Sequence, residues 1–453
     1  MATRPLEAAE LAALLSALAS ECDPREQLSG RAGDEGWPVD DQWRQYLLSL
    51  SAEAVSRCEL IGLHHASDNQ AMPTSLRRLC STVSDASFLL AGEERTSSPG
   101  AVSTGAIGTI AIKRCRSEAK EVQVTALLRA ATGTEYARQC RVRRVVDVGC
   151  GRGHLLAELK SALQVPALGL DIDASLLDSA RALYLDIDFR VHDVLEEGLL
   201  PLLHEGDLVV GLHPCGLLGE VIVEAVAAHG SCAMLMVPCC VHKQRGSLRA
   251  ARSRAGRELK LELTPSALKK ASMALDASAT VAPRRARHEL RELFRTRGVD
   301  IDSEGGGAEM EGVQSRVAKR GLAELAAVAL KKRGLPPPTV QELQVAASKS
   351  RPDFEARRRI SLLEVVLGEL LELVVIVDRA LCLAEAGHSV RLFRAFEATA
   401  SDRNLAIMAE PTRGLRSEGA AVKDGESGSE IGSCASQAEE SPSQAKDTQR
   451  SVV

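Results

Sequence analysis

Aromatic side chains, uncharged apolar runs and a regular cysteine framework are all scarce or missing in this chain of 453 residues. Aromatic residues make up only 2% of it, so stacking of bases on an aromatic platform is not expected to be its main means of recognition. The longest apolar run, residues 362–383, contains Glu364, Glu369, Glu372, Asp378 and Arg379. That much charge excludes a membrane-spanning helix, and we expect a core helix that packs on a sheet.

The 12 cysteines are scattered and do not follow the spacing of a disulfide framework. The apolar stretch near the N-terminus is interrupted by Glu7 and Glu10, which argues against a secretory or organellar targeting segment. Reduced thiols are therefore the expectation. We expect a cytoplasmic protein, with a nuclear location as the alternative.

A glycine-rich segment at residues 145–154, Val-Val-Asp-Val-Gly-Cys-Gly-Arg-Gly-His, carries most of the functional information. Its β-branched residues predict a strand that ends in Asp147, and a helical stretch begins at His154. Between them, three glycines allow the tight turn that brings a helix N-terminus against a small ligand: Gly149, Gly151 and Gly153. The next predicted strand, residues 165–171, ends in Asp171, whose carboxylate could accept hydrogen bonds from a ribose diol.

The acid before the glycine loop distinguishes two classes of ligand. Dinucleotide folds place an uncharged loop against a pyrophosphate, and Asp147 would repel phosphate. A carboxylate there favours a cationic amino-acid moiety, and S-adenosylmethionine carries an ammonium and a sulfonium but no phosphate. The segment resembles the first motif of class I methyltransferases, and a nicotinamide or flavin enzyme is the alternative. We therefore predict S-adenosylmethionine as the cofactor.

Strand and helix signals alternate after the loop and predict a parallel sheet with right-handed crossovers. Residues 189–193 resemble a third strand, with Asp193 facing the adenine amino group. Two buried strands, residues 207–212 and 232–237, follow, and the last two of seven are expected at residues 389–396 and 405–409. The predicted fold class is α/β, a Rossmann-like class I methyltransferase with a seven-stranded sheet, a helical N-terminal region and a large helical insertion before the last two strands.

Changes of composition along the chain predict its domain organisation. We expect the following divisions: a helical N-terminal region at 1–90, a linker at 91–108, the methyltransferase domain at 109–242 and 388–411, a helical insertion at 243–387 and a disordered tail at 412–453. The residues from Ser417 onward carry a net charge of −4 in a Ser/Gly/Glu-rich segment, which is typical of disorder. The remainder of the chain is therefore close to neutral.

Several segments outside the glycine loop share motifs with one family: residues 43–51, 72–76, 120–122, 212–216, 239–242, 373–379 and 401–407. On these segments the chain resembles the methyltransferase-like protein 25 family, also described as ribosomal-RNA-adenine-dimethylase-domain-containing proteins. The resemblance implies a cofactor-dependent methyltransferase that acts on RNA, with tRNA and rRNA as candidate substrates. Leu217 and Val241 depart from the family's motifs, which usually have Asp and an aromatic residue at these positions.

The predicted chemistry is an in-line displacement, in which holding the nucleophile about 3 Å from the methyl carbon in a dry pocket supplies much of the rate. His213, at the end of the fourth strand, is the candidate base for an oxygen or ring-nitrogen nucleophile. The alternative is that His213-Pro-Cys-Gly216 only shapes a turn. The Asn-Pro-Pro-Tyr type of loop, which holds an exocyclic amino group, is absent at this position, so N6 methylation of adenine is disfavoured.

Three cysteines are expected at the ends of the fourth and fifth strands: Cys215, Cys239 and Cys240. They are compatible with the chemistry of cytosine-C5 methylases, in which a thiolate adds to the base ring. Zinc ligation together with His213 and His242 is a second alternative, and buried thiols that pack at the sheet edge are a third. We predict His213 and the three cysteines as catalytic residues and no metal site.

Basic residues follow the fifth strand, and we predict that four of them contact RNA phosphates: Arg245, Arg249, Arg252 and Arg254. A solvated helix face is the alternative. A second basic cluster lies at residues 284–297. No membrane partner is expected. The alternative to an RNA methyltransferase is a catalytically weak or inactive scaffold that keeps the cofactor and acts through protein contacts of its insertion and tail.

Overall fold

The computed structural model describes residues 4–21, 40–63, 71–91, 117–244, 246, 248–271, 277–301 and 307–412. Residues 1–412 form the first of two units into which the chain divides, and all of the described residues belong to it. The predicted linker and tail fall almost entirely outside the described residues, and so does Arg245. The domain boundaries inside the first unit stay a prediction.

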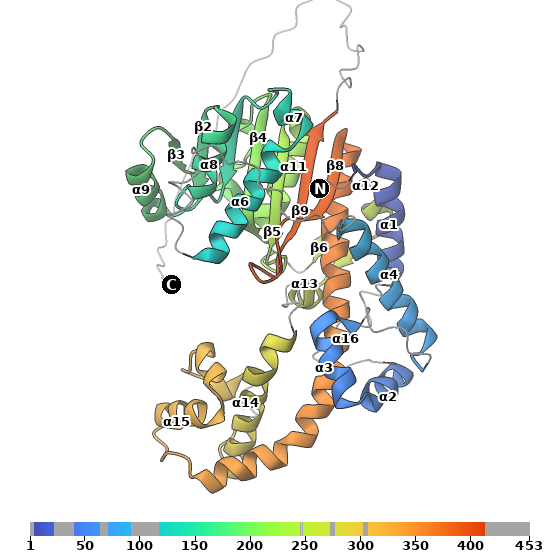
Figure 1. Ribbon diagram of the computed structural model, residues 1–453, viewed down its shortest axis with the longest axis vertical. Coiled ribbons are helices and arrows are strands. Elements are labelled where there is room, and N and C mark those ends of the chain that lie inside the picture. The colour runs from blue at the N-terminus through green and yellow to red at the C-terminus, as the bar shows by residue number, and fades with distance from the viewer. Residues whose placement is uncertain are drawn as a thin grey trace, which may run out of the picture. The chain divides into compact units, whose positions relative to one another are not determined.

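A seven-stranded sheet in the order β3-β2-β1-β4-β5-β9-β8 organises the first unit (Figure 1). Its strands are β1 (Arg144–Val148), β2 (Ala167–Asp171), β3 (Asp188–Val191), β4 (Asp207–Cys215), β5 (Ala233–Cys239), β8 (His388–Arg394) and β9 (Leu405–Pro411). The strands from β3 to β5 pair in parallel, whereas β9 pairs antiparallel with β5 and with β8. This arrangement confirms the predicted class I methyltransferase fold.

The two sides of the sheet bury different helices, because alternate strand residues face opposite sides. Val145 belongs to a core shared with α6 (Glu118–Thr132) and α8 (His154–Leu163), while Val146 belongs to one shared with α11 (Leu217–His229). The other helices within residues 117–244 are α7 (Glu135–Arg138), α9 (Ala174–Leu183), α10 (Val194–Glu197) and the 3-10 turn η2 (Leu200–Leu202).

Strand order reverses between β1 and β4, which are neighbours in the sheet. The helix after β1, α8, packs on one side of the sheet, and the helix after β4, α11, packs on the other. In open α/β sheets such a reversal opens a crevice outside the carboxyl ends of the strands. The glycine loop after β1 and the His213 segment at the end of β4 therefore meet at one edge. This placement creates the candidate site.

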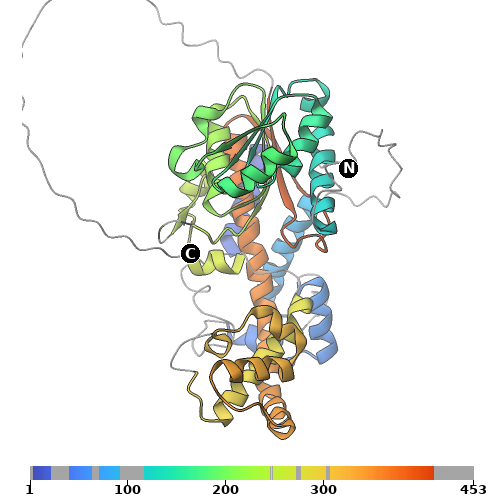
Figure 2. The ribbon, with the colours of Figure 1, turned by 90° about the vertical axis from the view of Figure 1, so that its left-hand side faces the viewer.

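The insertion between β5 and β8 is mostly helical, as predicted, and contains one short two-stranded sheet. Its elements are β6 (Arg249–Ala250), α12 (Arg254–Glu258), β7 (Glu262–Leu263), α13 (Pro265–Ala271), α14 (Ala277–Thr296), η3 (Ala308–Met310), η4 (Ser315–Arg320), α15 (Leu322–Lys332) and α16 (Val340–Glu385). Figure 2 shows α16 running from beside α14 and α15 to the sheet.

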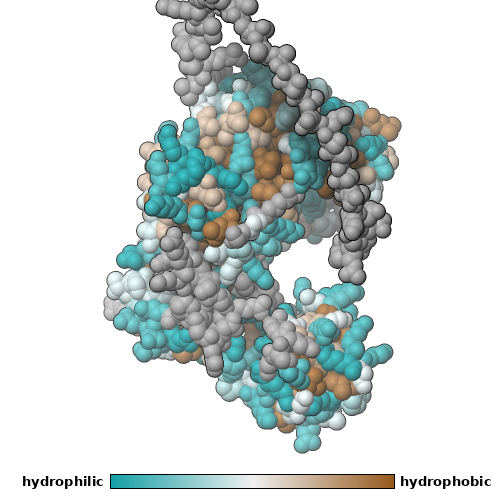
Figure 3. Space-filling model, turned by 180° about the vertical axis from the view of Figure 1, so that it is seen from behind, coloured by the Kyte–Doolittle hydropathy of each residue, from teal (hydrophilic) through white to brown (hydrophobic). Residues whose placement is uncertain are grey.

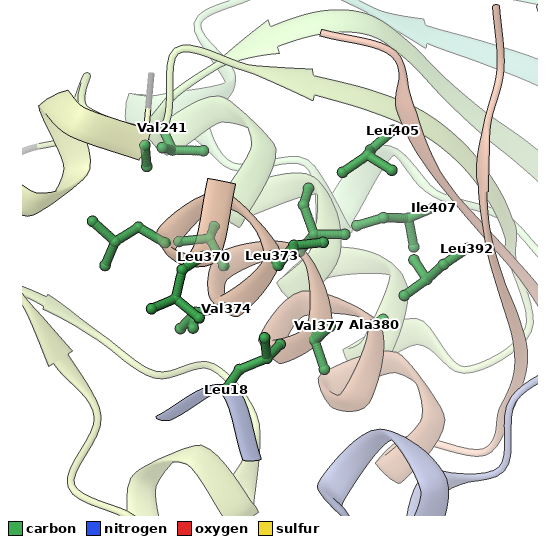
Figure 4. Close-up of a cluster of buried hydrophobic side chains, with 14 of the residues drawn as sticks. Leu18, Val241, Leu370, Leu373, Val374, Val377, Ala380, Leu392, Leu405 and Ile407 are labelled. Carbon is green, nitrogen blue, oxygen red and sulfur yellow. The ribbon is translucent and has the colours of Figure 1, made fainter. Parts of the chain in front are cut away.

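The second half of α16 is the core helix expected at residues 362–383, and it is buried against the last two strands of the sheet. Leu373 and Val377 face Leu392 of β8 and Ile407 of β9 in the close-up (Figure 4). The helix begins with a capping box in which Thr339 and Glu342 satisfy each other's backbone N–H groups. This half is buried on all sides, which is typical of a helix in the core of a large domain, and its buried residues include charged ones such as Asp378 and Arg379.

The described residues of the N-terminal region include four helices: α1 (Ala8–Glu21), α2 (Asp41–Ser49), α3 (Ala52–Ile61) and α4 (Thr74–Ala91). All four contact α16, and α4 also contacts β8. Leu18 of α1 lies in the same apolar cluster as Val374 of α16 (Figure 4). The N-terminal helices therefore share the core of the sheet domain. Among the described residues, no helix is long and apolar enough to span a membrane.

Candidate active site

The glycine loop between β1 and α8 adopts backbone conformations that L side chains rarely take. The φ angles of Gly149, Gly151 and Gly153 are +75°, +55° and +73°. A Cβ on Gly153 would lie 2.7 Å from Cζ of Phe189, whereas one on Gly151 would meet nothing within 4 Å. Gly153 is therefore required for packing against β3, and the space beside Gly151, at the N-terminus of α8, is open to a ligand.

Asp171, at the end of β2, supports this loop. Its Oδ2 accepts a hydrogen bond from the N–H of Gly151 at 2.8 Å, and its Oδ1 accepts one from the N–H of Asp173 at 2.9 Å. A carboxylate oxygen can accept a further bond, so a contact to a ribose hydroxyl is chemically compatible with this geometry. Asp193 caps α10, where its Oδ1 accepts from the N–H of Leu195 at 2.9 Å.

Asp147 is only 3% exposed, two residues before the first glycine of the loop. Burial raises the pKa of its carboxyl group to about 7; the charge of Lys120 on α6 opposes this rise, and that of Asp171 adds to it. The positive charge near Asp147 is therefore too small to offset the effect of burial on its ionisation. A cationic ligand would supply that charge and stabilise the ionised form.

His213 lies where the regular pairing of β4 with β5 is interrupted, and its φ of +67° is unusual for a residue with a side chain. Its Nε2 lies 3.3 Å from Oε1 of Gln123. The amide nitrogen of Gln123 donates to the carbonyl of Ala400 at 2.9 Å, which sets the orientation of the amide. Since Oε1 can only accept, Nε2 of the neutral imidazole carries the proton and Nδ1 is unprotonated.

The Nδ1 atom of His213 is buried and has no hydrogen-bond partner among the residues that the structure describes. Burial, and to a smaller extent the charge of Lys120, lowers the pKa of the imidazole to about 4. The ring packs edge-on against Phe396, with 6.3 Å between the centroids. A neutral imidazole with a buried lone pair can accept a hydrogen bond or a proton from a ligand.

The three predicted cysteines converge beside the backbone of His213. The Sγ atoms of Cys215, Cys239 and Cys240 all lie within 4.8 Å of one another. Cys215 Sγ and Cys239 Sγ are 3.2 Å apart, and the Cys239 thiol donates to the carbonyl of His213 at 3.3 Å. Burial, and then the hydrogen bond with Cys215, raises the pKa of Cys239 far above its usual range. Cys239 is therefore a thiol at neutral pH and a poor nucleophile.

The same sulfur atoms are ligands of the kind that zinc accepts. The structure thus brings three of the five suggested zinc ligands together. The absence of a metal site stays a prediction, as do the catalytic roles of the four residues.

Gly216 connects the end of β4 to the turn after β5. Its N–H donates to the carbonyl of Cys239 at 3.1 Å, and the next N–H, of Leu217, donates to the carbonyl of Lys243 at 2.9 Å. The φ of Gly216 is +54°, and a Cβ there would lie 1.9 Å from the carbonyl oxygen of Lys243. Only glycine allows the two loops to approach this closely.

A buried network of charges holds the start of α11 against α16. Glu220 accepts from Arg249 and from Arg379, each at 2.8 Å, and Arg379 also donates to the carbonyl of Gly216 at 3.3 Å. Burial opposes ionisation of Glu220, but Arg379 and Arg249 outweigh it and hold the pKa of Glu220 below its usual range. The insertion thereby supports the loop that contains Cys215.

The prediction that Arg249 contacts RNA is wrong. Its side chain is 0% exposed and pairs with Glu220 at 2.8 Å and with Asp378 at 2.9 Å. Arg252 is 26% exposed and pairs with Glu220 and Glu224. Removing Arg249 from this network would leave buried carboxylates uncompensated, which is strongly unfavourable. Arg254 is exposed, and its contact with RNA stays a prediction.

Gln123, Lys120 and Arg379 contribute to the site, but the sequence motifs do not identify them. Gln123 is a polar residue on the buried side of α6, and a polar residue at an apolar helix position is the signal that could have found it. In the sequence, Arg379 is one of several charged residues in the apolar run at residues 362–383. Its partner Glu220 lies 159 residues away in the sequence, so no local pattern connects them.

Residues 118–246 match the family model described as a methyltransferase domain. The match begins with α6 and continues past β5, so it includes Gln123, the glycine loop, His213 and the three cysteines. This part of the chain is a methyltransferase domain. No curated protein matches the chain.

The chain is also similar to three solved structures that span only parts of it. DesVI from Streptomyces venezuelae is 21% identical over 26% of this chain and 50% of that one, with a TM-score of 0.20. The plantazolicin methyltransferase BpumL in complex with SAH is 15% identical over 41% and 61%, with a TM-score of 0.22. The sugar N-methyltransferase KedS8 from Streptoalloteichus sp is 19% identical over 34% and 64%, with a TM-score of 0.23. The matches cover less than two thirds of each protein, and similarity at this level carries no argument about substrate.

Proposed function

We propose that this chain is an S-adenosylmethionine-dependent methyltransferase that modifies an oxygen or a ring nitrogen of RNA, with His213 as the group that orients and deprotonates the acceptor. The observation that carries the proposal is the buried, unprotonated Nδ1 of His213, whose tautomer is set by Gln123. It lies within the segment that matches a methyltransferase domain.

The residues around the glycine loop fit the proposed cofactor. Asp147 is a buried carboxyl group that a cationic ligand would stabilise, and the space beside Gly151 is open. In the proposed complex Asp171 accepts from the ribose hydroxyls and Asp193 faces the adenine. S-adenosylmethionine supplies a methyl group activated by its sulfonium. The chain's own residues bind and orient it.

The acceptor chemistry follows from the state of His213. If the acceptor is a hydroxyl group, its oxygen would bond to the methyl carbon as the bond from that carbon to the sulfonium sulfur breaks, which leaves S-adenosylhomocysteine, and Nδ1 of His213 would take the hydroxyl proton. For a ring nitrogen, the imidazole accepts a hydrogen bond and holds the base in line. Cys239, whose pKa is raised by burial, is less suited to the thiolate addition that cytosine-C5 methylation needs.

RNA is proposed as the acceptor because the motifs of this chain resemble the methyltransferase-like protein 25 family. The resemblance includes the Leu-His-Pro-Cys-Gly segment at residues 212–216 and the Cys-Cys segment at residues 239–240. The two segments meet at backbone groups: the Cys239 thiol donates to the carbonyl of His213, and the N–H of Gly216 donates to the carbonyl of Cys239. A small-molecule acceptor is the outcome that would replace this proposal.

The proposal is tested by comparing modified nucleosides by mass spectrometry in cells with and without the protein, followed by single-turnover assays on the RNA identified. We expect one methylated nucleoside to disappear, and His213→Ala to lower the single-turnover rate by about 100-fold, the usual contribution of a general base. S-adenosylhomocysteine binding, measured by calorimetry, should be unchanged in that variant. A full rate in His213→Ala contradicts the assigned role.

A further inference from the structure

A cavity of about 750 Å³ lies in the insertion, between α13, α14 and the first half of α16. Seven lysine and arginine side chains line it, against two glutamates. Hydrophilic side chains also cover much of the surface of the lobe that contains α14 and α15 (Figure 3). The volume falls within the range of about 300–1,000 Å³ that is typical of ligand-binding pockets.

Part of this positive charge is neutralised inside the protein. Glu309 is 2% exposed and pairs with Arg287 at 3.2 Å and with Arg291 at 2.9 Å. Burial opposes its ionisation, but Arg291 outweighs it and holds the pKa of Glu309 below its usual range. Arg358, on α16, pairs with Glu59 of α3. These pairs order the wall of the cavity and do not need a ligand.

Two cations of the lining, Lys269 on α13 and Arg284 on α14, have no acidic partner among the described residues. Lys269 is exposed and Arg284 is half-buried. Like charges gathered around a concave surface repel one another and destabilise the folded state unless an anion neutralises them. The arrangement is therefore suited to an anionic ligand.

Basic residues lie between the cavity and the edge of the sheet that contains the candidate active site. His242 lies in the turn directly after Cys240. Val241 of that turn belongs to the same buried cluster as Leu268 of α13, and the next residue of α13, Lys269, lines the cavity. Positive charge extends from the cavity toward the acceptor side of the methyltransferase domain.

We propose that this cavity binds backbone phosphates of the RNA strand whose acceptor nucleotide enters the active site. The inference rests on the proposed function, because it assigns the RNA a second contact on the same enzyme. A strand fits the arrangement better than a single small anion, since the positive charge is distributed from Arg284 through Lys269 to the turn after β5. Phosphate contacts of this kind position the strand without reading its sequence.

The test compares the full-length double variant Lys269→Ala/Arg284→Ala with a control that loses the same charge on the same insertion, Arg316→Ala/Lys319→Ala. Both control residues are exposed on η4 and do not line the cavity. Binding of a fluorescent single-stranded RNA is measured by anisotropy over a range of salt concentrations. We expect the cavity variant to bind roughly tenfold more weakly, and its slope of log affinity against log salt to be shallower by about 1.4, or about 0.7 for each lost phosphate contact.

The control variant should match the wild type, and all three proteins should bind S-adenosylhomocysteine equally. An unchanged slope in the cavity variant overturns the inference and leaves the proposed function standing. Conversely, a shallower slope in a protein that methylates no RNA overturns the proposed function and supports the cavity as an RNA site. Competition by poly-glutamate as strong as that by RNA would overturn the assignment to RNA.

Discussion

Asp147 and His213 both have pKa values that differ from those of exposed residues, and burial is the first cause for each. The carboxyl group of Asp147 has its pKa raised to about 7, and the imidazole of His213 has its pKa lowered to about 4. Lys120 affects both groups, lowering each pKa. Perturbed groups of opposite kind on two neighbouring strand ends are typical of functional sites.

Asp147→Asn should stabilise the ligand-free protein at high pH while weakening cofactor binding. The folded-state pKa of about 7 lies above the unfolded value, so this group's contribution to stability is present at low pH and is lost as pH rises through 7. We expect the variant to gain roughly 2 kcal/mol at pH 8 and much less at pH 5 in urea unfolding. Asp178→Asn, at an exposed position, serves as the control. A loss of stability at pH 8 would contradict the raised pKa of the buried Asp147 carboxyl group.

Gln123→Glu should move the acid limb of the activity profile. The wild-type rate is expected to be constant above about pH 5 and to fall as His213 is protonated near pH 4. A carboxylate against Nε2 favours the imidazolium, so the limb should shift upward by about 1–3 pH units. Gln164→Glu adds the same charge at an exposed position and should leave kcat/KM unchanged. An unshifted limb contradicts the contact between Gln123 and His213.

At the scale of elements, the junction between β4 and α11 depends on contacts from two distant segments. Gly216 packs against the backbone of Lys243, and Arg379 of α16 donates to the carbonyl of Gly216. The turn after β5 and the insertion helix thus both determine where Cys215 lies. A loop with so many backbone bonds is expected to be rigid, which suits a group that must position an acceptor.

Gly216→Ala should be far more harmful than Gly230→Ala, although both glycines have positive φ angles. A Cβ on Gly216 would lie 1.9 Å from a backbone oxygen, whereas one on Gly230 meets nothing within 4 Å. We expect Gly230→Ala to lower the free energy of unfolding by about 1 kcal/mol through left-handed strain alone, and Gly216→Ala to lower it by at least about 3 kcal/mol. Equal losses in thermal or urea unfolding would show that the close approach is absent.

At the scale of the molecule, α16 is the element that the other regions have in common. Its second half packs on β8 and β9, its buried face contacts the N-terminal helices, and its first half forms part of the cavity wall. Glu220 and Asp378 tie it to the segment after β5. The insertion is therefore structurally continuous with the methyltransferase domain.

Leu373→Ala should destabilise the N-terminal helices and the methyltransferase domain together. Leu373 is 1% exposed, and removing such a side chain from a core costs about 2–5 kcal/mol. Tryptophan fluorescence and far-ultraviolet circular dichroism should report one shared transition with the same lowered midpoint. Leu185→Ala, at a position that is 92% exposed, should change stability by less than about 0.5 kcal/mol. Two separate transitions would contradict a common core.

Local patterns in the sequence were sufficient to predict the sheet and the glycine loop. Buried β-branched strands, glycines in a turn and alternating helices are encoded within a few neighbouring residues, because backbone sterics and hydrophobic periodicity act over that range. The same signals predicted that β8 and β9 lie near the end of the chain, and they predicted the core helix at residues 362–383. Convergence of Cys215 and Cys239 followed from the rule that parallel strands end at one edge.

Only the tertiary structure decided which polar groups pair with which. The basic stretch after β5 predicts a phosphate-binding surface, but the side chain of Arg249 is buried. It pairs with Glu220 and Asp378, which are 29 and 129 residues away in the sequence, because their buried negative charges need a positive partner. Gln123 reaches His213 across 90 residues and Ala400 across 277. The cations around the cavity likewise come from three helices. The sequence shows which charged residues are present. Burial and geometry decide whether each of them pairs with a carboxylate, lies near a neutral imidazole or is available to a ligand, because the energy of a charge depends on its surroundings.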